Sequence, residues 1–245
     1  MRFFALVRAV ALCWMVLSGA AVADEPPPAG HTIGVFGDSL GDGLWGGLYA
    51  VLKSHPEDHL YRYSKVGAGI ARSDYDNWFE DFTAALDRDH IDVAVVMFGA
   101  NDQQSIRDES HKGYNFPTDG WKTVYSARVD SILGEFSKRK IPVIWVGLPI
   151  MRKDELNTGA EVLDDIFVTE TNRSGATFVP MFDAFKGDDG QFATHLPDAS
   201  GHLRQVRADD GIHFTPYGYE LIATKVTQAI GMIEPPGKAR TATRQ

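Results

Sequence analysis

Residues 91–98 of the chain read IDVAVVMF, and this stretch decides the fold class. Apolar side chains occupy nearly every position, whereas a strand with one face in water alternates apolar and polar residues. A continuous apolar run of this length is typical of a strand that is covered on both faces. Strands of this kind belong to parallel sheets that have helices packed on each side.

Strand-like and helix-like segments alternate on both sides of this stretch. Runs rich in β-branched residues predict further strands, and apolar side chains at helical spacing predict helices. We expect strands at residues 32–36, 60–66, 141–146 and 176–180, and helices at residues 40–52, 75–86, 121–136, 161–172 and 216–230. The alternation predicts an α/β fold with a mostly parallel sheet between two layers of helices.

Three segments lack a clear periodicity, namely residues 101–120, 148–156 and 183–209. The first two directly follow predicted strands, and the third closely follows the last one. Ligands bind beyond the carboxyl ends of the strands in sheets of this type, and long loops in a compact domain are usually functional. We therefore expect these segments to border the functional site.

The first residues have the pattern of an export signal. Arg2 and Arg8 give the first residues a positive charge, and an apolar run covers residues 9–18. Ala21-Val22-Ala23 then precedes a Pro-rich stretch. This pattern predicts a signal peptide at residues 1–23 that is cleaved after Ala23. A membrane anchor is disfavoured because the apolar run is shorter than the ~20 residues of a spanning helix. We expect an exported protein, periplasmic in a Gram-negative bacterium or secreted, with no membrane span in the mature chain.

Beyond the signal, the length suits one α/β domain. We expect a Pro-rich leader at residues 24–30, one domain at residues 31–233 and a flexible tail at residues 234–245. Cys13 is the only cysteine, so the processed chain would have neither disulfides nor thiolate metal sites. The formal net charge of −9 argues against nucleic acid and anionic membranes as main partners.

A second stretch, VFGDSLGDGL at residues 35–44, raises the question of what Ser39 does. A serine between a strand and a helix can cap the helix. Residues 41–46 (GDGLWG) formally match a dinucleotide fingerprint, but Asp38 and Asp42 would repel a pyrophosphate there. The third role is that of a nucleophile, which needs a base beside it. At a helix start, N–H groups and the helix dipole can also stabilise an oxyanion.

His213 is the histidine that the sequence marks as a base. It lies in DDGIHFTP, residues 209–216, directly before the last predicted helix. Asp210 comes three residues earlier with Gly211 between them, so a tight turn can bring the carboxylate to one imidazole nitrogen. The other nitrogen is then left for Ser39. On its own, this spacing is more typical of a local turn.

Four short motifs together resemble the SGNH hydrolase (GDSL-type esterase/lipase) family. They are GDSL at residues 37–40, VGAG at 66–69, GAND at 99–102 and DGIH at 210–213. All four occur in the family's order and at the expected loop positions. The resemblance, to an exported bacterial member, implies a three-layer α/β/α sandwich with a mostly parallel, flavodoxin-like five-stranded sheet.

The resemblance also implies a role for each motif in ester hydrolysis. Ser39 would be the nucleophile, His213 the general base, and Asp210 the group that orients His213. The N–H groups of Ser39 and Gly69 and the side-chain amide of Asn101 would form the oxyanion hole.

The glycine motif departs from the family's pattern. The family commonly has an asparagine upstream and a serine beside the glycine, whereas this chain has Lys65 followed by VGAG. By spacing, Gly69 is the first choice as oxyanion donor and Gly67 the second.

Other acidic residues near the motifs have alternative roles. Asp209 is the closest competitor of Asp210. We expect Asp38 to be a supporting or turn residue and Asp102 to fix the loop that presents Asn101. No spacing typical of metal ligands occurs, and we expect neither a metal nor another cofactor.

The substrate is specified less closely. Members of the family hydrolyse lipids, aryl esters, thioesters and acetyl groups on sugars, and export favours small O-acyl groups on cell-envelope or extracellular carbohydrate. The alternatives are an O-acyltransferase acting on glycans, a broad arylesterase or lysophospholipase, and a non-catalytic glycan-binding module. The loop after Asn101 carries Tyr114 and Phe116, which suit a sugar, whereas we expect Trp45 and Tyr49 to pack in the core.

Overall fold

The computed structural model describes residues 30–72 and 78–232. The predicted signal peptide, nearly all of the predicted leader and the predicted tail lie outside these residues. Within them, no helix has both the length and the apolar character needed to cross a membrane.

Parallel strands form the central sheet. They are β1 (Thr32–Gly37), β2 (His59–Ser64), β3 (Val93–Met97), β6 (Val143–Val146) and β7 (Thr177–Val179). Their spatial order is β2-β1-β3-β6-β7, and each neighbouring pair is parallel. Numbered along the chain among themselves, they have the order 2-1-3-4-5 of flavodoxin-like folds. The predicted fold class is confirmed.

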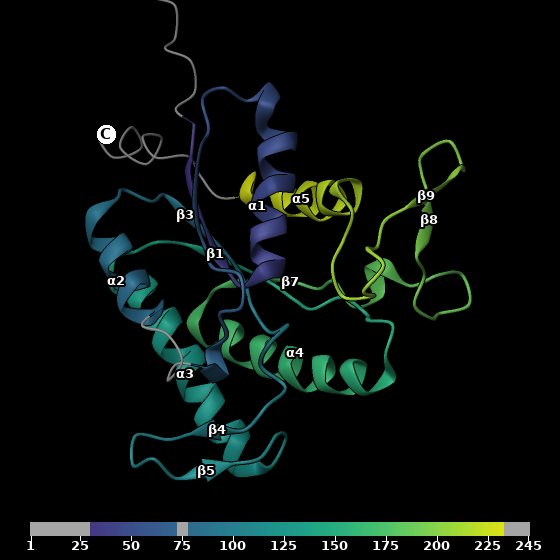
Figure 1. Cartoon of the computed structure of the whole chain (residues 1–245). Coiled ribbons are helices and arrows are strands. Elements are labelled where there is room, and N and C mark those ends of the chain that lie inside the picture. Colours follow the sequence, from purple (N-terminus) through teal and green to yellow (C-terminus); the bar gives the residue numbers. More distant parts are fainter. Residues whose placement is uncertain (1–29, 73–77, 233–245) are drawn as a thin grey trace, which may run out of the picture.

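Helices cover both faces of this sheet (Figure 1). On one face α1 (Ser39–Val51) packs against α5 (Pro216–Ile230), and on the other lie α2 (Trp78–Arg88), α3 (Asp119–Lys138) and α4 (Asp154–Ser174). Short 3-10 turns occur at Leu52–Ser54, Ile70–Arg72 and Asp183–Phe185. The result is the three-layer sandwich that the sequence predicts.

The core lies where the apolar patterns place it. β3 is buried along its whole length. In α2 one face is buried, and it carries Trp78, Phe82, Ala85 and Leu86. In α1 the buried residues include Leu40, Leu44 and Leu48, which recur every four positions and so line one side of the helix.

Tyr49 does not pack in the core as expected, because 57% of it is exposed. Its position on α1 points away from the side that carries Leu44 and Leu48. Trp45 is partly buried and stacks on Tyr49, with ring centroids 5.6 Å apart. The expectation of core packing was therefore wrong for Tyr49.

α4 begins at Asp154, inside a segment that we expected to be irregular. Asp154 and Glu155 occupy its first turn, where negative charge interacts favourably with the helix dipole. Gly159, which lowers helix propensity, obscures the pattern there. A Cβ at this position would lie 2.1 Å from the end of the Gln103 side chain, so a larger residue would displace that side chain.

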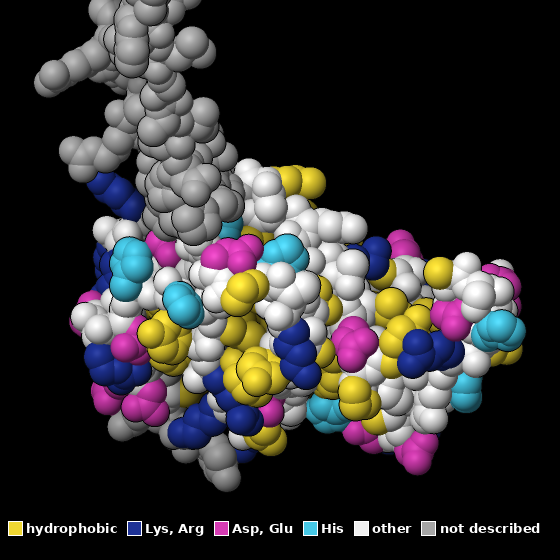
Figure 2. Space-filling model, turned by 90° about the horizontal axis from the view of Figure 1, so that it is seen from above, with side chains coloured by type: hydrophobic (Ala, Val, Ile, Leu, Met, Phe, Trp, Pro, Cys, Tyr) yellow, Lys and Arg dark blue, Asp and Glu magenta, His cyan; other side chains and the backbone are white. Residues whose placement is uncertain are grey.

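The other two irregular segments contain short hairpins. β4 (Ile106–Arg107) pairs with β5 (Gly113–Tyr114), and β8 (His195–Pro197) pairs with β9 (Leu203–Gln205). Strands of two or three residues are too short for an alternating pattern to be recognised. The β8–β9 hairpin projects to one side of the sandwich, and it forms a lobe beyond the body when the molecule is seen from above (Figures 1 and 2).

Candidate active site

The serine in question is the first residue of α1, directly beyond the end of β1. The helix is capped by Asp38, whose carboxylate accepts from the N–H of Leu40 at 2.8 Å. Ser39 is therefore not the N-cap residue, and its hydroxyl is available for another partner.

That partner is His213. Ser39 Oγ lies 2.7 Å from His213 Nε2, although 174 positions separate the two residues in the sequence. On the other side of the imidazole, Nδ1 lies 2.6 Å from Asp210 Oδ2. With the proton on Nδ1 donated to Asp210, Nε2 is free to accept from the serine hydroxyl. The structure thus joins the three residues that the sequence predicts, in the predicted order.

A tight turn builds the acidic end of this chain of contacts. Gly211 has a φ of +74°, which favours glycine, and its N–H donates to Ala208 O at 3.1 Å. Asp210 Oδ1 accepts from the N–H groups of Ile212 and His213, at 2.8 and 2.9 Å. One carboxylate oxygen is thus fixed by the backbone, and the other is left for the imidazole.

These contacts decide the charge of Asp210. Burial by itself raises its pKa, but the hydrogen bonds from the His213 ring and from the two backbone N–H groups outweigh burial and lower the pKa to about 2. Hydrogen bonds that favour the charged form have this effect. Asp210 is therefore a carboxylate over the whole neutral range and can hold the Nδ1 proton of His213.

Asp38 connects the serine with the loop that carries Asn101. Its Oδ2 accepts from the N–H groups of Gly99 and Ala100, at 3.0 and 2.9 Å. Burial raises its pKa to about 7, against the lowering effect of the N–H groups of Leu40, Ala100 and Gly99. Asp38 thus fixes the start of α1 relative to the end of β3.

Asn101 reaches across to the glycine motif. Its Nδ2 donates to Ala68 O at 2.9 Å, which places the amide against the peptide between Ala68 and Gly69. An amide nitrogen carries two hydrogens, and this bond uses one of them.

The two candidate glycines are required for different reasons. Gly67 has a φ of +82° in a turn that the N–H of Ala68 closes on Lys65 O, at 3.0 Å. Gly69 is required by close approach, since a Cβ there would lie 2.4 Å from Asp102 Oδ1. Of the two, Gly69 belongs to the peptide that Asn101 contacts.

Asp102 lies beneath this loop and not beside His213. Its Oδ1 accepts from the N–H of Ala71 at 2.9 Å, and its Oδ2 accepts from Tyr125 Oη at 2.7 Å. Burial raises its pKa. We expected Asp102 to support this loop, whereas Tyr125 has only the position of a core residue in the predicted helix at residues 121–136. No local pattern indicates a bond between residues so far apart in the chain.

No group of three or more His, Cys, Asp or Glu side chains in residues 30–72 and 78–232 is arranged to hold a metal ion. Trp121, in the first turn of α3, is buried, and its Nε1 donates to Gln104 O in the preceding loop at 2.7 Å. Trp121 therefore holds the loop in place.

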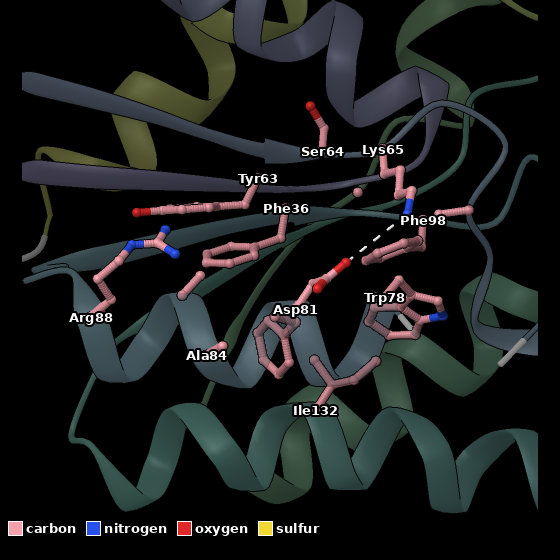
Figure 3. Close-up of a pocket in the computed structure, with 14 residues that line it drawn as sticks. Phe36, Tyr63, Ser64, Lys65, Trp78, Asp81, Ala84, Arg88, Phe98 and Ile132 are labelled. Atoms are coloured by element: carbon pink, nitrogen blue, oxygen red, sulfur yellow. Dashed lines mark ion pairs between the residues drawn. The ribbon is translucent and has the colours of Figure 1, made fainter. Parts of the chain in front are cut away.

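A cavity of about 410 Å³ lies on the α2 side of the sheet (Figure 3). Its apolar lining comes from Phe36, Trp78, Phe82, Phe98 and Ile132. Gly37 and Ala68 also line it, so the cavity reaches the strand and the loop that lead to the candidate active site. Lys65 and Asp81 form an ion pair of 4.0 Å among the lining residues.

Comparison with solved structures places this arrangement among SGNH hydrolase folds. A GDSL-like lipase from Bacteroides thetaiotaomicron has a TM-score of 0.58 at 15% identity, over 82% of this chain and 88% of that one. A member of the lipolytic protein G-D-S-L family from Veillonella parvula has a TM-score of 0.58 at 17% identity, over 82% and 99%. An acetylxylan esterase from Geobacillus stearothermophilus has a TM-score of 0.60 at 17% identity, over 83% and 95%. At these identities the likeness establishes the fold.

The comparison with curated proteins found no match. Among family models, residues 32–229 match the one described as "Protein of unknown function (DUF459)". This match covers the sheet and all the contacts described above. The predicted resemblance is confirmed at the level of the fold, and the chain belongs to the DUF459 family.

Proposed function

We propose that the protein is a serine esterase that hydrolyses carboxylic esters through an acyl-enzyme. The observation that carries this proposal is the chain of contacts from Ser39 Oγ to His213 Nε2 and from His213 Nδ1 to Asp210 Oδ2. A hydroxyl in contact with a base that is itself oriented by a carboxylate is the arrangement of an activated nucleophile.

The proposed reaction has two halves. Ser39 Oγ attacks the acyl carbonyl while His213 Nε2 takes the hydroxyl proton and then delivers it to the leaving alcohol. Water next attacks the acyl-serine, with His213 again taking and returning the proton, so that the carboxylic acid and the free enzyme are released. Asp210 stabilises the imidazolium in both halves.

Charge on the carbonyl oxygen would be stabilised at the start of α1. We assign the N–H groups of Ser39 and Gly69 and the free hydrogen of the Asn101 amide as donors to this oxyanion. The positive end of the α1 dipole reinforces them. The contact between Asn101 and Ala68 O supports the choice of Gly69 over Gly67.

For the substrate we propose small O-acyl groups, acetyl above all, on cell-envelope or extracellular carbohydrate. The side chains of His213 and Asp210 are 34% and 47% exposed. A bulky carbohydrate that carries the acyl group can therefore approach them. The acetylxylan esterase among the structural neighbours supports the same substrate class. Export of the protein, which the first residues favour, is part of this proposal.

A broad arylesterase is the second candidate, because the cavity beside the site has room for a ring or an acyl chain (Figure 3). An O-acyltransferase would use the same residues with a sugar hydroxyl in place of water. A non-catalytic glycan-binding module is disfavoured by the intact chain of contacts at Ser39.

The proposal is tested by supplying the purified protein with acetylated glycans and with p-nitrophenyl acetate, butyrate and octanoate. We expect acetate release from the glycans, and turnover that falls with chain length. Release of acid from long-chain lipids alone would contradict the substrate class. Transfer of the acyl group to an added sugar, in preference to water, would establish the transferase alternative.

Asp210→Asn is expected to lower kcat by about 10⁴-fold, because the amide no longer stabilises the productive tautomer of His213. The matched control is Asp209→Asn, which changes the adjacent acid and is expected to keep kcat within about twofold. Steady-state kinetics with p-nitrophenyl acetate give both values. An equal fall in kcat in the two variants would contradict the assignment of Asp210 as the residue that orients His213.

Ala84→Trp tests what the cavity does. Ala84 is an exposed lining residue on α2, so a large side chain there can narrow the cavity without disturbing the core. If the acyl group is small, turnover of p-nitrophenyl acetate stays unchanged, as it should in the control Glu80→Trp on the same helix. A loss of about tenfold with octanoate alone, the effect of losing about two buried methylenes, would favour the arylesterase.

A further inference from the structure

We propose that Arg207 is a positioning residue that holds the turn carrying Asp210 and His213 in its reactive geometry. The inference rests on the proposed function, since it concerns the base of that reaction. Arg207 precedes the turn and lies outside the four motifs that the sequence singled out.

Arg207 is completely buried. Its Nη1 donates to Ile150 O at 2.5 Å, and its Nη2 donates to Ile212 O at 2.8 Å and to Gly211 O at 3.3 Å. Ile150 lies in the segment after β6, so one guanidinium ties that segment to two consecutive carbonyls of the turn.

The surroundings of this charge are unusual. Within the described residues, the hydrogen-bond acceptors of the guanidinium are all backbone carbonyl oxygens. The rings of Phe192 and Phe214 lie against it, with centroids 4.9 and 4.2 Å away. A buried cation without a carboxylate in contact is costly, and burial lowers the pKa of Arg207 to about 10. A fold that needed only an apolar core would gain by replacing it.

The shape of the side chain explains why an arginine is needed. Its planar fork directs N–H groups toward several acceptors at once, whereas a lysine presents its hydrogens from a single nitrogen. The carbonyls of Ile150 and Ile212 belong to different segments, and the fork satisfies both. Loss of the guanidinium would leave these carbonyls without a donor and the turn without its anchor.

Arg152 holds the same turn from the outside. Its N–H donates to Gly211 O at 3.0 Å, and its Nη1 donates to Asp209 O at 2.6 Å. Its Cβ packs where a side chain on residue 211 would stand, since a Cβ on Gly211 would lie 2.5 Å from it. Carbonyls on both sides of Asp210 are therefore bound by arginines, and the carboxylate has little freedom to move.

This anchoring bears on catalysis because reacting groups must be placed closely, and a shift of about 1 Å can lower a rate about 100-fold. Arg207 has no exposed surface and cannot touch substrate. Its loss should therefore act on kcat, through the position of His213, and leave KM nearly unchanged.

The test compares Arg207→Met and Arg207→Lys with wild type in steady-state kinetics and thermal unfolding. Phe167→Leu, in the core of α4 away from the turn, is the control for lost stability. We expect kcat to fall about 100-fold in Arg207→Met with KM within about threefold, and a smaller loss in Arg207→Lys, which keeps the charge. If kcat falls no further than in Phe167→Leu at equal loss of stability, the proposal is wrong.

A second readout separates this proposal from the proposed function. The Nδ1 proton of His213, held between the ring and Asp210, should give a low-field proton NMR signal that is absent in Asp210→Asn. We expect the signal to be lost or broadened in Arg207→Lys, which retains the buried charge and is the variant better suited to folding. An unchanged signal would overturn the positioning role whether or not the protein is an esterase. A wild type that shows the signal but no turnover would instead contradict the esterase proposal.

Discussion

Ser39→Ala is expected to lower kcat for p-nitrophenyl acetate by about 10⁴-fold or more, because the acyl-enzyme can no longer form. The substitution removes one oxygen, and Ser39 does not cap α1, since Asp38 does. Folding should therefore be unaffected, with the same unfolding midpoint as wild type. Circular dichroism and thermal unfolding provide this comparison.

The matched control for Ser39 is Ser200→Ala. Ser200 also lies beside a histidine and an aspartate, with its Oγ 2.8 Å from His202 Nδ1 and 2.6 Å from Asp198 Oδ1. There the hydroxyl lies between the acid and the histidine, so its proton is held by the carboxylate and the imidazole is not oriented as a base. We expect Ser200→Ala to keep full activity. An active Ser39→Ala enzyme would contradict the assignment of the nucleophile.

Asp38→Ala is expected to lower the free energy of unfolding by about 3 kcal/mol or more, because each buried N–H group that is left without an acceptor costs about 1–3 kcal/mol. Three backbone N–H groups donate to this carboxylate, and alanine leaves all of them unpaired. Activity should fall as well. Two of the three N–H groups belong to Gly99 and Ala100, which directly precede Asn101, so their loss would loosen the loop that presents the Asn101 amide. Denaturant unfolding measures the loss of stability.

Asp42→Asn is the control for Asp38. Asp42 pairs with the half-exposed Arg62 at 2.7 Å, and exposed pairs of this kind contribute only about 0–1 kcal/mol. A loss in Asp38→Ala no larger than in Asp42→Asn would show that the buried network contributes little to stability.

Asp38 also predicts a pH dependence of stability. Its pKa is raised to about 7 in the folded protein, whereas a free aspartate titrates near about 3.9. Between these values the folded protein binds a proton at Asp38 that the unfolded chain has released, so this residue makes stability fall as pH rises through the window. Unfolding measured from pH 4 to pH 7 should show a weaker fall in Asp38→Asn than in wild type. An identical slope would contradict the prediction.

The sequence was sufficient for the sheet because buried parallel strands leave continuous apolar runs such as residues 91–98. The contacts of Ser39, Asp210 and His213 were expected only through the family resemblance of four short motifs, because the spacing of Asp210 and His213 by itself fits a local turn as well. Neither the start of α4 nor the hairpins could be predicted in this way. Gly159 weakens the helical pattern at the start of α4, and strands of two residues have no period.

The supporting contacts were beyond the sequence for a similar reason. Tyr125 and Arg207 form hydrogen bonds with residues far away in the sequence, which no local pattern indicates. Each also resembles an ordinary residue of its own segment. Tyr125 has the spacing of a core residue, and it is one. Arg207 stands in a polar stretch, RQVRADD at residues 204–210, that suggests an exposed loop, yet it is completely buried.

The central claim, that Ser39 is activated by His213 to form an acyl-enzyme, is tested most directly by covalent labelling. The protein is treated with an aryl ester of a phosphonate, digested and examined by mass spectrometry, beside the His213→Ala variant. We expect one phosphonyl group per chain, on Ser39, and labelling that is slowed by orders of magnitude in His213→Ala. Absence of labelling, labelling of another residue, or labelling at the same rate without His213 would contradict the account.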